Sequence, residues 1–235
     1  MAKKKILLLA DDLRMHSGIA TMARTFVMGT LHHYDWAQIG GAIKHPEKGK
    51  VMDLNESVRK DTGVKDAYLK IYPVDGYGNQ ELLRQVINLE NPDAILHYTD
   101  PRFWEWLYQM EHEIRTQMPL FYYNIWDDLP YPMWNEPFYE SCDLIMNISK
   151  QTVNIVDNVC RNKPRTKTDN TYIPHGINEK NFYPINKDNK EWGSLLQFRR
   201  NIVGERDYDF IVFWNNRNIR RKLPGDVVMA FKTFC

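Results

Sequence analysis

Four cationic side chains stand close together near the end of the sequence, directly after an apolar run at 210–214. They are Arg217, Arg220, Arg221 and Lys222. Arginine offers planar, forked hydrogen-bond donors and lysine a compact positive charge, and both bind phosphate oxygens. A diphosphate site and a solvated basic loop fit this composition equally well. The position directly after a predicted strand favours the diphosphate site.

A second candidate site follows the first apolar run of the sequence, residues 5–10. His16, Ser17 and Gly18 lie between this run and a helical pattern that begins near Gly18. A glycine at such a turn lets the backbone approach a ligand, and a helix N-terminus offers free N–H groups to an anion. There is no GxGxxG motif, so we do not expect a dinucleotide site. An ordinary helix N-cap explains these residues as well as a ligand site does.

A third segment, residues 171–184, contains a tight turn after a predicted strand. Gly176 can adopt a positive φ there, and His175 is placed at the turn. A single histidine is more often structural than catalytic, so these residues alone leave the role of His175 open.

The elements that would position these residues alternate between short apolar runs and helical patterns. We expect strands at 5–10, 36–43, 67–72, 94–98, 120–125, 144–148 and 172–174. We expect helices from Gly18 and at 79–90, 103–115 and 150–159, the last capped by Ser149, and a loop-rich segment at 44–65. This alternation predicts an α/β fold with a doubly wound, mostly parallel sheet.

The composition changes near Pro184, where we place a domain boundary. The first predicted domain is 1–184, and 185–235 holds a polar linker, a helix through 195–202, a strand at 210–214 and a helix from Pro224. One strand and one or two helices cannot close a core. We therefore expect 185–235 to be an incomplete second α/β domain, continued in a longer protein or completed by a partner chain.

The overall composition narrows the class of protein. The 235 residues include 31 basic and 30 acidic side chains, a net charge of +1, which disfavours a nucleic-acid binder. The three cysteines form no CxxC pair, so neither a zinc site nor a disulfide framework is indicated, and a reducing, cytoplasmic setting is the simplest expectation. No stretch approaches the roughly 20 apolar residues of a membrane span.

Aromatic residues are abundant, at 13% of the chain, and they gather at 103–106 and 121–134. Ordinary core packing explains most of them. The alternative, for one or two of these residues, is that their rings stack on the rings of a bound sugar.

The three candidate segments described above, taken together, resemble the retaining GT-B glycosyltransferases of family 4, the glycogen-synthase and sucrose-synthase-like group. The family has roughly Ile-Pro-Asn-Gly-Val-Asp and then Phe-x-Pro at its interdomain crossing, where residues 173–178 read Ile-Pro-His-Gly-Ile-Asn and 182–184 read Phe-Tyr-Pro. Residues 142–152 are similar to its Ala-Asp…Ser-x-x-Thr segment. Arg217 and Lys222 keep the spacing of its diphosphate motif, with Asn216 in place of a glycine.

The resemblance implies that 1–184 is a Rossmann-like GT-B N-terminal domain on the acceptor side. It implies transfer of a sugar from a nucleotide diphosphate sugar to an unknown acceptor with retention, without a metal or other cofactor. Arg217 and Lys222 would hold the diphosphate, and Gly18 would approach the phosphates or the acceptor. Asp100 and Asp127 would line the cleft as candidate catalytic residues.

The remaining candidate substrate-binding residues carried by the resemblance are His16, Ser17, His97, Trp126, His175 and Gly176. Trp126 stands where the family usually has a histidine. The acidic donor-binding segment of the family would lie beyond residue 235, so we expect little transferase activity from this chain alone.

Two alternatives stay open. One is a non-catalytic acceptor-binding domain, or one subunit of a split glycosyltransferase. The other is a different nucleotide-using enzyme of GT-B form, such as an epimerase. A phosphorylase that uses pyridoxal phosphate is less favoured, because no lysine lies in a recognisable cofactor segment.

Overall fold

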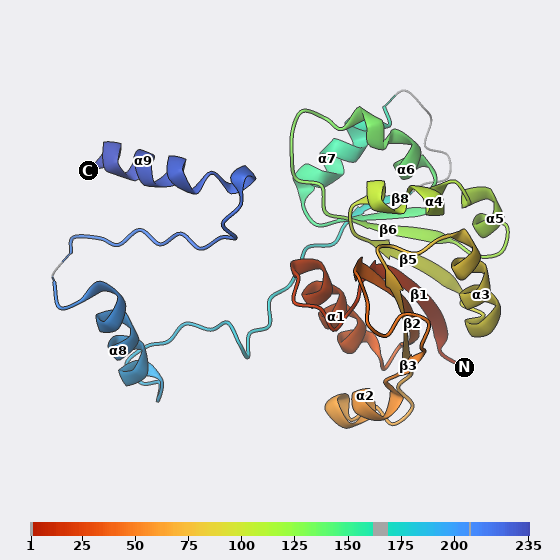
Figure 1. Cartoon of the computed structure of the whole chain (residues 1–235), viewed down its shortest axis with the longest axis horizontal. Helices are drawn as coiled ribbons and strands as arrows, with labels where there is room; N and C mark the ends of the chain where they lie inside the picture. The colour runs from red at the N-terminus through yellow and green to blue at the C-terminus, as the bar shows by residue number, and fades with distance from the viewer. Residues whose placement is uncertain (1, 162–168, 207) are drawn as a thin grey trace. The chain divides into compact units, whose positions relative to one another are not determined.

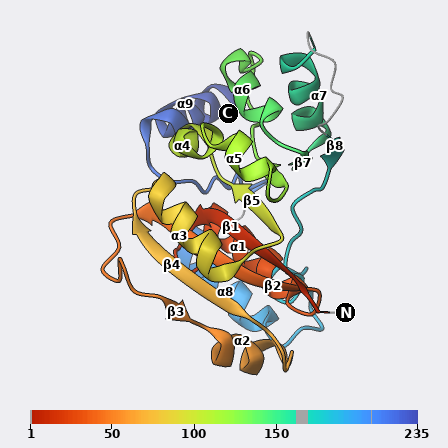
Figure 2. The same ribbon diagram turned by 90° about the vertical axis from the view of Figure 1, so that its right-hand side faces the viewer.

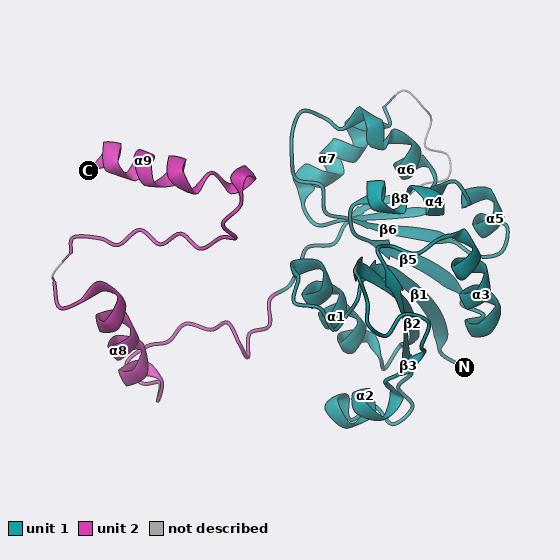
Figure 3. Cartoon of the chain, viewed as in Figure 1, with its two compact units in different colours: residues 1–176 teal, residues 177–235 magenta. Residues whose placement is uncertain are grey.

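The chain forms two compact units, which Figure 3 shows in separate colours. The computed structural model describes residues 2–161, 169–206 and 208–235. Unit 1 comprises Met1–Gly176 and unit 2 comprises Ile177–Cys235. The boundary predicted at 184/185 lies inside unit 2.

Unit 1 is built on one eight-stranded sheet (Figure 1). Its strands are β1 Lys4–Asp11, β2 Tyr34–Ile43, β3 Met52–Asp53, β4 Leu69–Asp75, β5 Ala94–Tyr98, β6 Leu120–Asn124, β7 Leu144–Asn147 and β8 Asp169–Tyr172. The order across the sheet is β3-β4-β2-β1-β5-β6-β7-β8. Every pair is parallel except β3 with β4. This arrangement confirms the predicted α/β, Rossmann-like, mostly parallel sheet.

Helices cover the two faces of the sheet unequally. The described helices of unit 1 are α1 Gly18–Thr30, α2 Asn55–Thr62, α3 Gln80–Glu90, η1 Pro101–Trp104, α4 Glu105–Tyr108, α5 Glu111–Arg115, η2 Met133–Asn135, α6 Glu136–Glu140 and α7 Lys150–Val159. The buried apolar side chains of α3 to α7 belong to one cluster, and those of α1 and α2 belong to another. Figure 2 views the sheet from the side of α3.

Each cluster follows from the alternation of side chains along the strands. In β1, Leu7 and Leu9 belong to the cluster on the α3 side, whereas Leu8 and Ala10 belong to the cluster on the α1 side. Both faces of β1 are therefore buried, which explains why its sequence is continuously apolar instead of alternating.

Unit 2 contains α8 Trp192–Val203, η3 Arg220–Lys222 and α9 Pro224–Phe234. None of its described residues is buried. The predicted strand at 210–214 is wrong: this segment is extended but unpaired, and all five apolar side chains are exposed. The Phe210 ring meets the rings of Phe231 and Phe234 in α9 edge to face. A strand also needs neighbouring strands that accept its backbone hydrogen bonds, and the described residues of unit 2 form none.

Two details of unit 1 also differ from expectation. The segment at 44–65, predicted as loop-rich, contains β3 and α2. The helix predicted at 103–115 is divided into η1, α4 and α5, because the chain leaves the helical path at Met110 and buries that side chain in the core. The predicted cap of α7 is confirmed, since Ser149 Oγ accepts a hydrogen bond from the backbone N–H of Thr152 at 3.0 Å.

Candidate functional site

The sheet has a topological switch point between β1 and β5. β1 pairs with β2 on one side and β5 on the other, and the later strands follow β5 outward in the opposite direction. In open α/β sheets ligands bind outside the carboxyl ends of the strands at such a point. Here β1 ends at Asp11 and β5 ends at Tyr98, followed by Thr99 and Asp100. The predicted Ser17–Gly18 loop and Asp100 thus follow neighbouring strand ends.

Ser17 caps α1 and also contacts the end of β1. Its Oγ accepts a hydrogen bond from the N–H of Ala20 at 3.0 Å and donates one to Asp11 Oδ2 at 2.8 Å. Burial raises the pKa of Asp11, and the Ser17 hydrogen bond offsets part of that rise. The predicted N-cap is confirmed, while His16 and Gly18 are exposed beside it. Ser17 thus satisfies the N–H of Ala20, and the earlier N–H groups of the first turn are the ones that such a helix N-terminus can offer to an anion.

The second aspartate of this loop is ion-paired inside the protein. Arg14 Nη2 lies 2.8 Å from Asp12 Oδ2, and Arg14 Nη1 lies 2.6 Å from Glu47 Oε2. His45 Nε2 is 3.0 Å from the same Asp12 oxygen. Burial raises the pKa of Asp12, but the hydrogen bonds and charge of Arg14, with His45, outweigh it and hold that pKa below its usual range. The carboxylate therefore fixes the loop after β2 against the loop after β1.

The backbone of β2 passes very close to the Asp12 side chain at Gly40. A Cβ atom at Gly40, in β2, would lie 2.9 Å from Asp12 Oδ2. The glycine thus makes room for the buried carboxylate, and any larger side chain there would displace it.

Asp100 is held by its near neighbour Arg102. Its Oδ1 accepts hydrogen bonds from the Arg102 backbone N–H at 3.0 Å and from Nε at 2.9 Å. Burial raises the pKa of Asp100, but the hydrogen bonds and charge of Arg102 outweigh it and bring the pKa below its usual range. The carboxylate is ionised at neutral pH, so it can accept a hydrogen bond or stabilise positive charge but cannot act as a general acid.

Asp127 and Trp126 lie in the loop after β6. The N–H of Trp126 donates to Asn124 Oδ1 at 3.1 Å, and Thr152 Oγ1 donates to the Trp126 carbonyl at 2.8 Å. Gln151 Nε2 donates to the Asp127 carbonyl at 3.2 Å. The backbone of this loop is therefore fixed to the start of α7, while the Asp127 side chain is exposed at the same edge of the sheet as Asp100.

His97 does not fit the prediction of substrate contact. Its side chain is fully buried in β5, Nδ1 lies 2.7 Å from the Tyr108 hydroxyl, and its ring stacks on Tyr122 with centroids 5.1 Å apart. Burial lowers the pKa of His97 to about 3, so the ring is neutral. The alternation of β5 places it in the core because Tyr98, the next residue, points to the other face.

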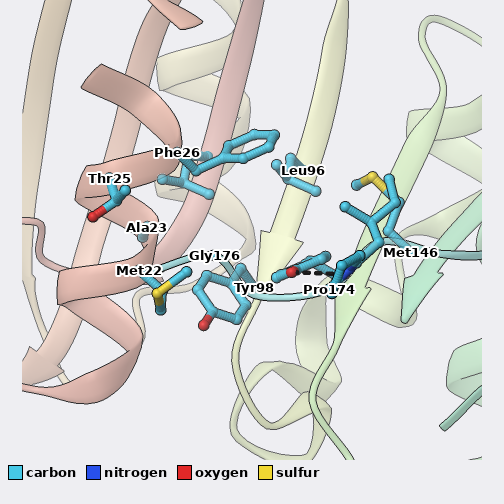
Figure 4. Close-up of a pocket in the computed structure, with 12 residues that line it drawn as sticks. Met22, Ala23, Thr25, Phe26, Leu96, Tyr98, Met146, Pro174 and Gly176 are labelled. Atoms are coloured by element: carbon cyan, nitrogen blue, oxygen red, sulfur yellow. Dashed lines mark hydrogen bonds between the residues drawn. The ribbon is translucent and has the colours of Figure 1, made fainter. Parts of the chain in front are cut away.

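His175 and Gly176 lie at the end of unit 1, and Gly176 lines a small apolar groove (Figure 4). The Tyr98 hydroxyl is 3.3 Å from His175 Nε2, and burial lowers the pKa of His175. The groove has a cavity volume of about 140 Å³, and among its lining residues are Met22, Phe26, Leu96, Tyr98, Met146 and Pro174. Ligand pockets usually measure about 300–1,000 Å³, so this groove is too small for a nucleotide sugar.

Arg217 and Lys222 both lie in unit 2. Arg217 is in the extended segment before η3 and Lys222 ends that short helix. The N–H of Lys222 donates to the Ile219 carbonyl at 3.0 Å, and Leu223 follows with φ 46°. The Arg217 side chain is exposed and that of Lys222 is partly exposed, so both cations are accessible to an anion.

Several residues that shape the carboxyl edge lie outside the site predicted from the sequence. Asp11 and Asp12 directly follow the apolar run at 5–10 in the sequence, but this pattern does not predict that both side chains are buried. Tyr77 carried no signal, because its position depends on a stack with Phe103, at 5.0 Å between centroids, which joins the ends of β4 and β5.

None of the helices that the structure describes combines the length and apolarity needed to span a bilayer. Among the residues described, we find no group of three His, Cys, Asp or Glu that could hold a metal ion. No model of a known protein family matches the sequence, and no curated protein matches it.

Proposed function

We propose that the chain is part of a GT-B glycosyltransferase, related to family 4, that transfers a sugar from a nucleotide diphosphate sugar with retention. The observation that carries the proposal is the switch point between β1 and β5. There a capped helix N-terminus and the ionised Asp100 follow adjacent strand ends of a Rossmann-like sheet. The motifs at 173–184 and 217–222 supply the link to this family.

The two units have separate tasks in this proposal. Unit 1 binds the acceptor at its carboxyl edge, where Asp100 and Asp127 provide carboxylates. Unit 2 binds the donor, and Arg217 and Lys222 neutralise the diphosphate that leaves when the glycosyl bond breaks. Because the described residues of unit 2 bury no side chain, these cations are weakly ordered by packing, and we expect weak donor affinity and little turnover from the chain itself.

Calorimetry with nucleoside diphosphates tests the donor task. Arg217→Ala and Lys222→Ala are compared with Arg199→Ala and Lys232→Ala, which remove the same charges from exposed positions on α8 and α9. Hydrogen bonds to charged groups contribute about 1.5–3 kcal/mol, and 1.4 kcal/mol is tenfold in affinity. We expect each of the first two changes to weaken binding about tenfold or more, and each control less than about twofold.

The contrast between the units also favours a second candidate, a non-catalytic acceptor-binding domain or one subunit of a split transferase. Unit 1 has two buried apolar clusters, whereas no described residue of unit 2 is buried. Absence of diphosphate binding, or binding that is indifferent to Arg217→Ala and Lys222→Ala, would contradict the donor task and favour this second function.

A further inference from the structure

Exposed aromatic rings gather at the carboxyl edge of unit 1. Phe103, in η1, is 53% exposed and Trp134, in η2, is 56% exposed. Together with Tyr77, Arg102 and Trp126 they form a set that we call the aromatic row. Its members follow the carboxyl ends of β4, β5 and β6, which lie on one edge of the parallel part of the sheet.

The members of the row are connected by direct contacts. Phe103 stacks on Tyr77 with an interplanar angle of 1°. Arg102, the neighbour of Phe103, places its guanidinium carbon 5.3 Å from the centre of the Trp126 ring. Trp126 in turn meets Trp134 edge to face, with centroids 6.0 Å apart. The row therefore consists of the Tyr77–Phe103 stack and the Arg102–Trp126–Trp134 group, which are joined through the chain neighbours Arg102 and Phe103.

Polar contacts hold two members of the row, Arg102 and Trp126, in place before any ligand arrives. Asp100 accepts hydrogen bonds from the Arg102 side chain, and Trp126 Nε1 donates to the Asp128 carbonyl at 3.0 Å. Thr152 binds the Trp126 carbonyl from the start of α7. A surface fixed in this way loses little conformational entropy on binding, which favours affinity.

Core packing does not explain the exposure of these rings. Trp104, next to Phe103 in the chain, is fully buried and lies 5.5 Å from the Tyr77 ring, so the core beneath the row is already closed. Phe103 and Trp134 bury little surface and contribute little to folding. Aromatic side chains exposed together at one edge are typical of a binding surface.

The charges beside the row indicate the chemistry of its ligand. Arg102, the cation of the row, is already paired with Asp100, and the carboxylates of Asp127 and Asp128 are exposed next to Trp126. This surface disfavours phosphates, nucleic acid and anionic lipid headgroups. It suits a neutral ring that has an apolar C–H face for stacking and hydroxyl groups that donate to carboxylates. A pyranose sugar has both.

We propose that the aromatic row binds the sugar rings of a neutral oligosaccharide, which serves as the acceptor. This inference rests on the proposed transferase function for the role of the saccharide as acceptor, but not for its binding.

The test is saccharide binding by the whole chain without any nucleotide. Neutral oligosaccharides of glucose, mannose and galactose are titrated, and binding is followed by tryptophan fluorescence and by saturation-transfer NMR. Trp134→Ala and Phe103→Ala are compared with Trp214→Ala and Phe198→Ala, which remove exposed aromatic rings from unit 2. We expect at least one saccharide to bind, each of the first two changes to weaken it fivefold or more, and the controls to stay within twofold.

Each other outcome overturns part of the account. No binding by any saccharide, or binding indifferent to Trp134→Ala and Phe103→Ala, overturns the aromatic row as a sugar site. Binding to vesicles of phosphatidylglycerol that these variants abolish, without saccharide binding, assigns the row to membranes instead. Diphosphate calorimetry on the same samples separates the two proposals. Saccharide binding without diphosphate binding would support the aromatic row and contradict the donor task of unit 2. Diphosphate binding without saccharide binding would support the donor task and overturn the aromatic row as a sugar site.

Discussion

The two units of this chain contain similar apolar segments with opposite outcomes. Residues 5–10 form the centre of β1, paired on both sides and buried on both faces. Residues 210–214 are at least as apolar, yet they remain unpaired and exposed. The comparison teaches that an apolar run specifies a strand only where other segments provide backbone partners and cover both faces.

The largest expected difference between the units concerns tryptophan. Trp36, in β2, is fully buried, while Trp214 is 40% exposed. Replacing a buried tryptophan by alanine costs about 3–5 kcal/mol because it removes buried apolar surface and leaves a cavity. We expect Trp36→Ala to lower the free energy of unfolding by that amount in urea titrations, and Trp214→Ala to change it by less than about 1 kcal/mol. Equal losses would mean that unit 2 has a core of its own.

The second-largest expected effect is a decrease in the free energy of unfolding at low pH, caused by a residue of unit 1. His97 is neutral in the folded chain because burial lowers its pKa to about 3, whereas an unfolded histidine has a pKa of about 6.5. As the pH falls below 6.5, the unfolded state gains a proton that the folded state does not, so stability decreases. From pH 6.5 to 5 the expected loss is about 2 kcal/mol.

His97→Phe isolates this contribution, since the variant keeps an aromatic ring against Tyr122 but cannot titrate. Urea unfolding of both proteins between pH 7 and pH 5 should show a shallower loss for the variant. Parallel pH profiles would contradict the burial of a neutral His97.

Removal of a helix cap is expected to have an intermediate effect on stability, and this effect should differ between α1 and α8. Ser17 caps α1 with its side chain, whereas Glu191 at the start of α8 makes no side-chain cap hydrogen bond. We expect Ser17→Ala to cost about 0.5–2 kcal/mol and Glu191→Ala close to nothing, measured by thermal unfolding. Ser17→Asn, which restores an acceptor, should recover most of the loss; failure to recover would show that contact with Asp11 matters more than the cap.

The smallest effect is expected in the exposed segment itself. The Phe213 side chain is 84% exposed, so Phe213→Ala should change the free energy of unfolding by less than about 0.5 kcal/mol. A loss above 2 kcal/mol in chemical denaturation would show that Phe213 is packed in solution.

Much of unit 1 could be predicted from the sequence, since local periodicity determines most of its elements. The run at 94–98, the helical pattern at 79–90 and the Ser149 cap each correspond to an element of the structure. Periodicity could not show that His97 points into the core, because the whole of β5 is buried and no polar alternation marks its faces. The stack of Tyr77 on Phe103 joins segments distant in sequence, so no local pattern predicts it.

The proposed donor task is tested most directly by a site-resolved NMR titration of the isotopically labelled chain with uridine, guanosine and adenosine diphosphates. The account predicts that at least one nucleotide shifts the backbone amides of residues 215–223, and that Arg217→Ala removes these shifts while the amides of β1 keep their positions. The absence of shifts at 215–223 with all three nucleotides at millimolar concentration would contradict it.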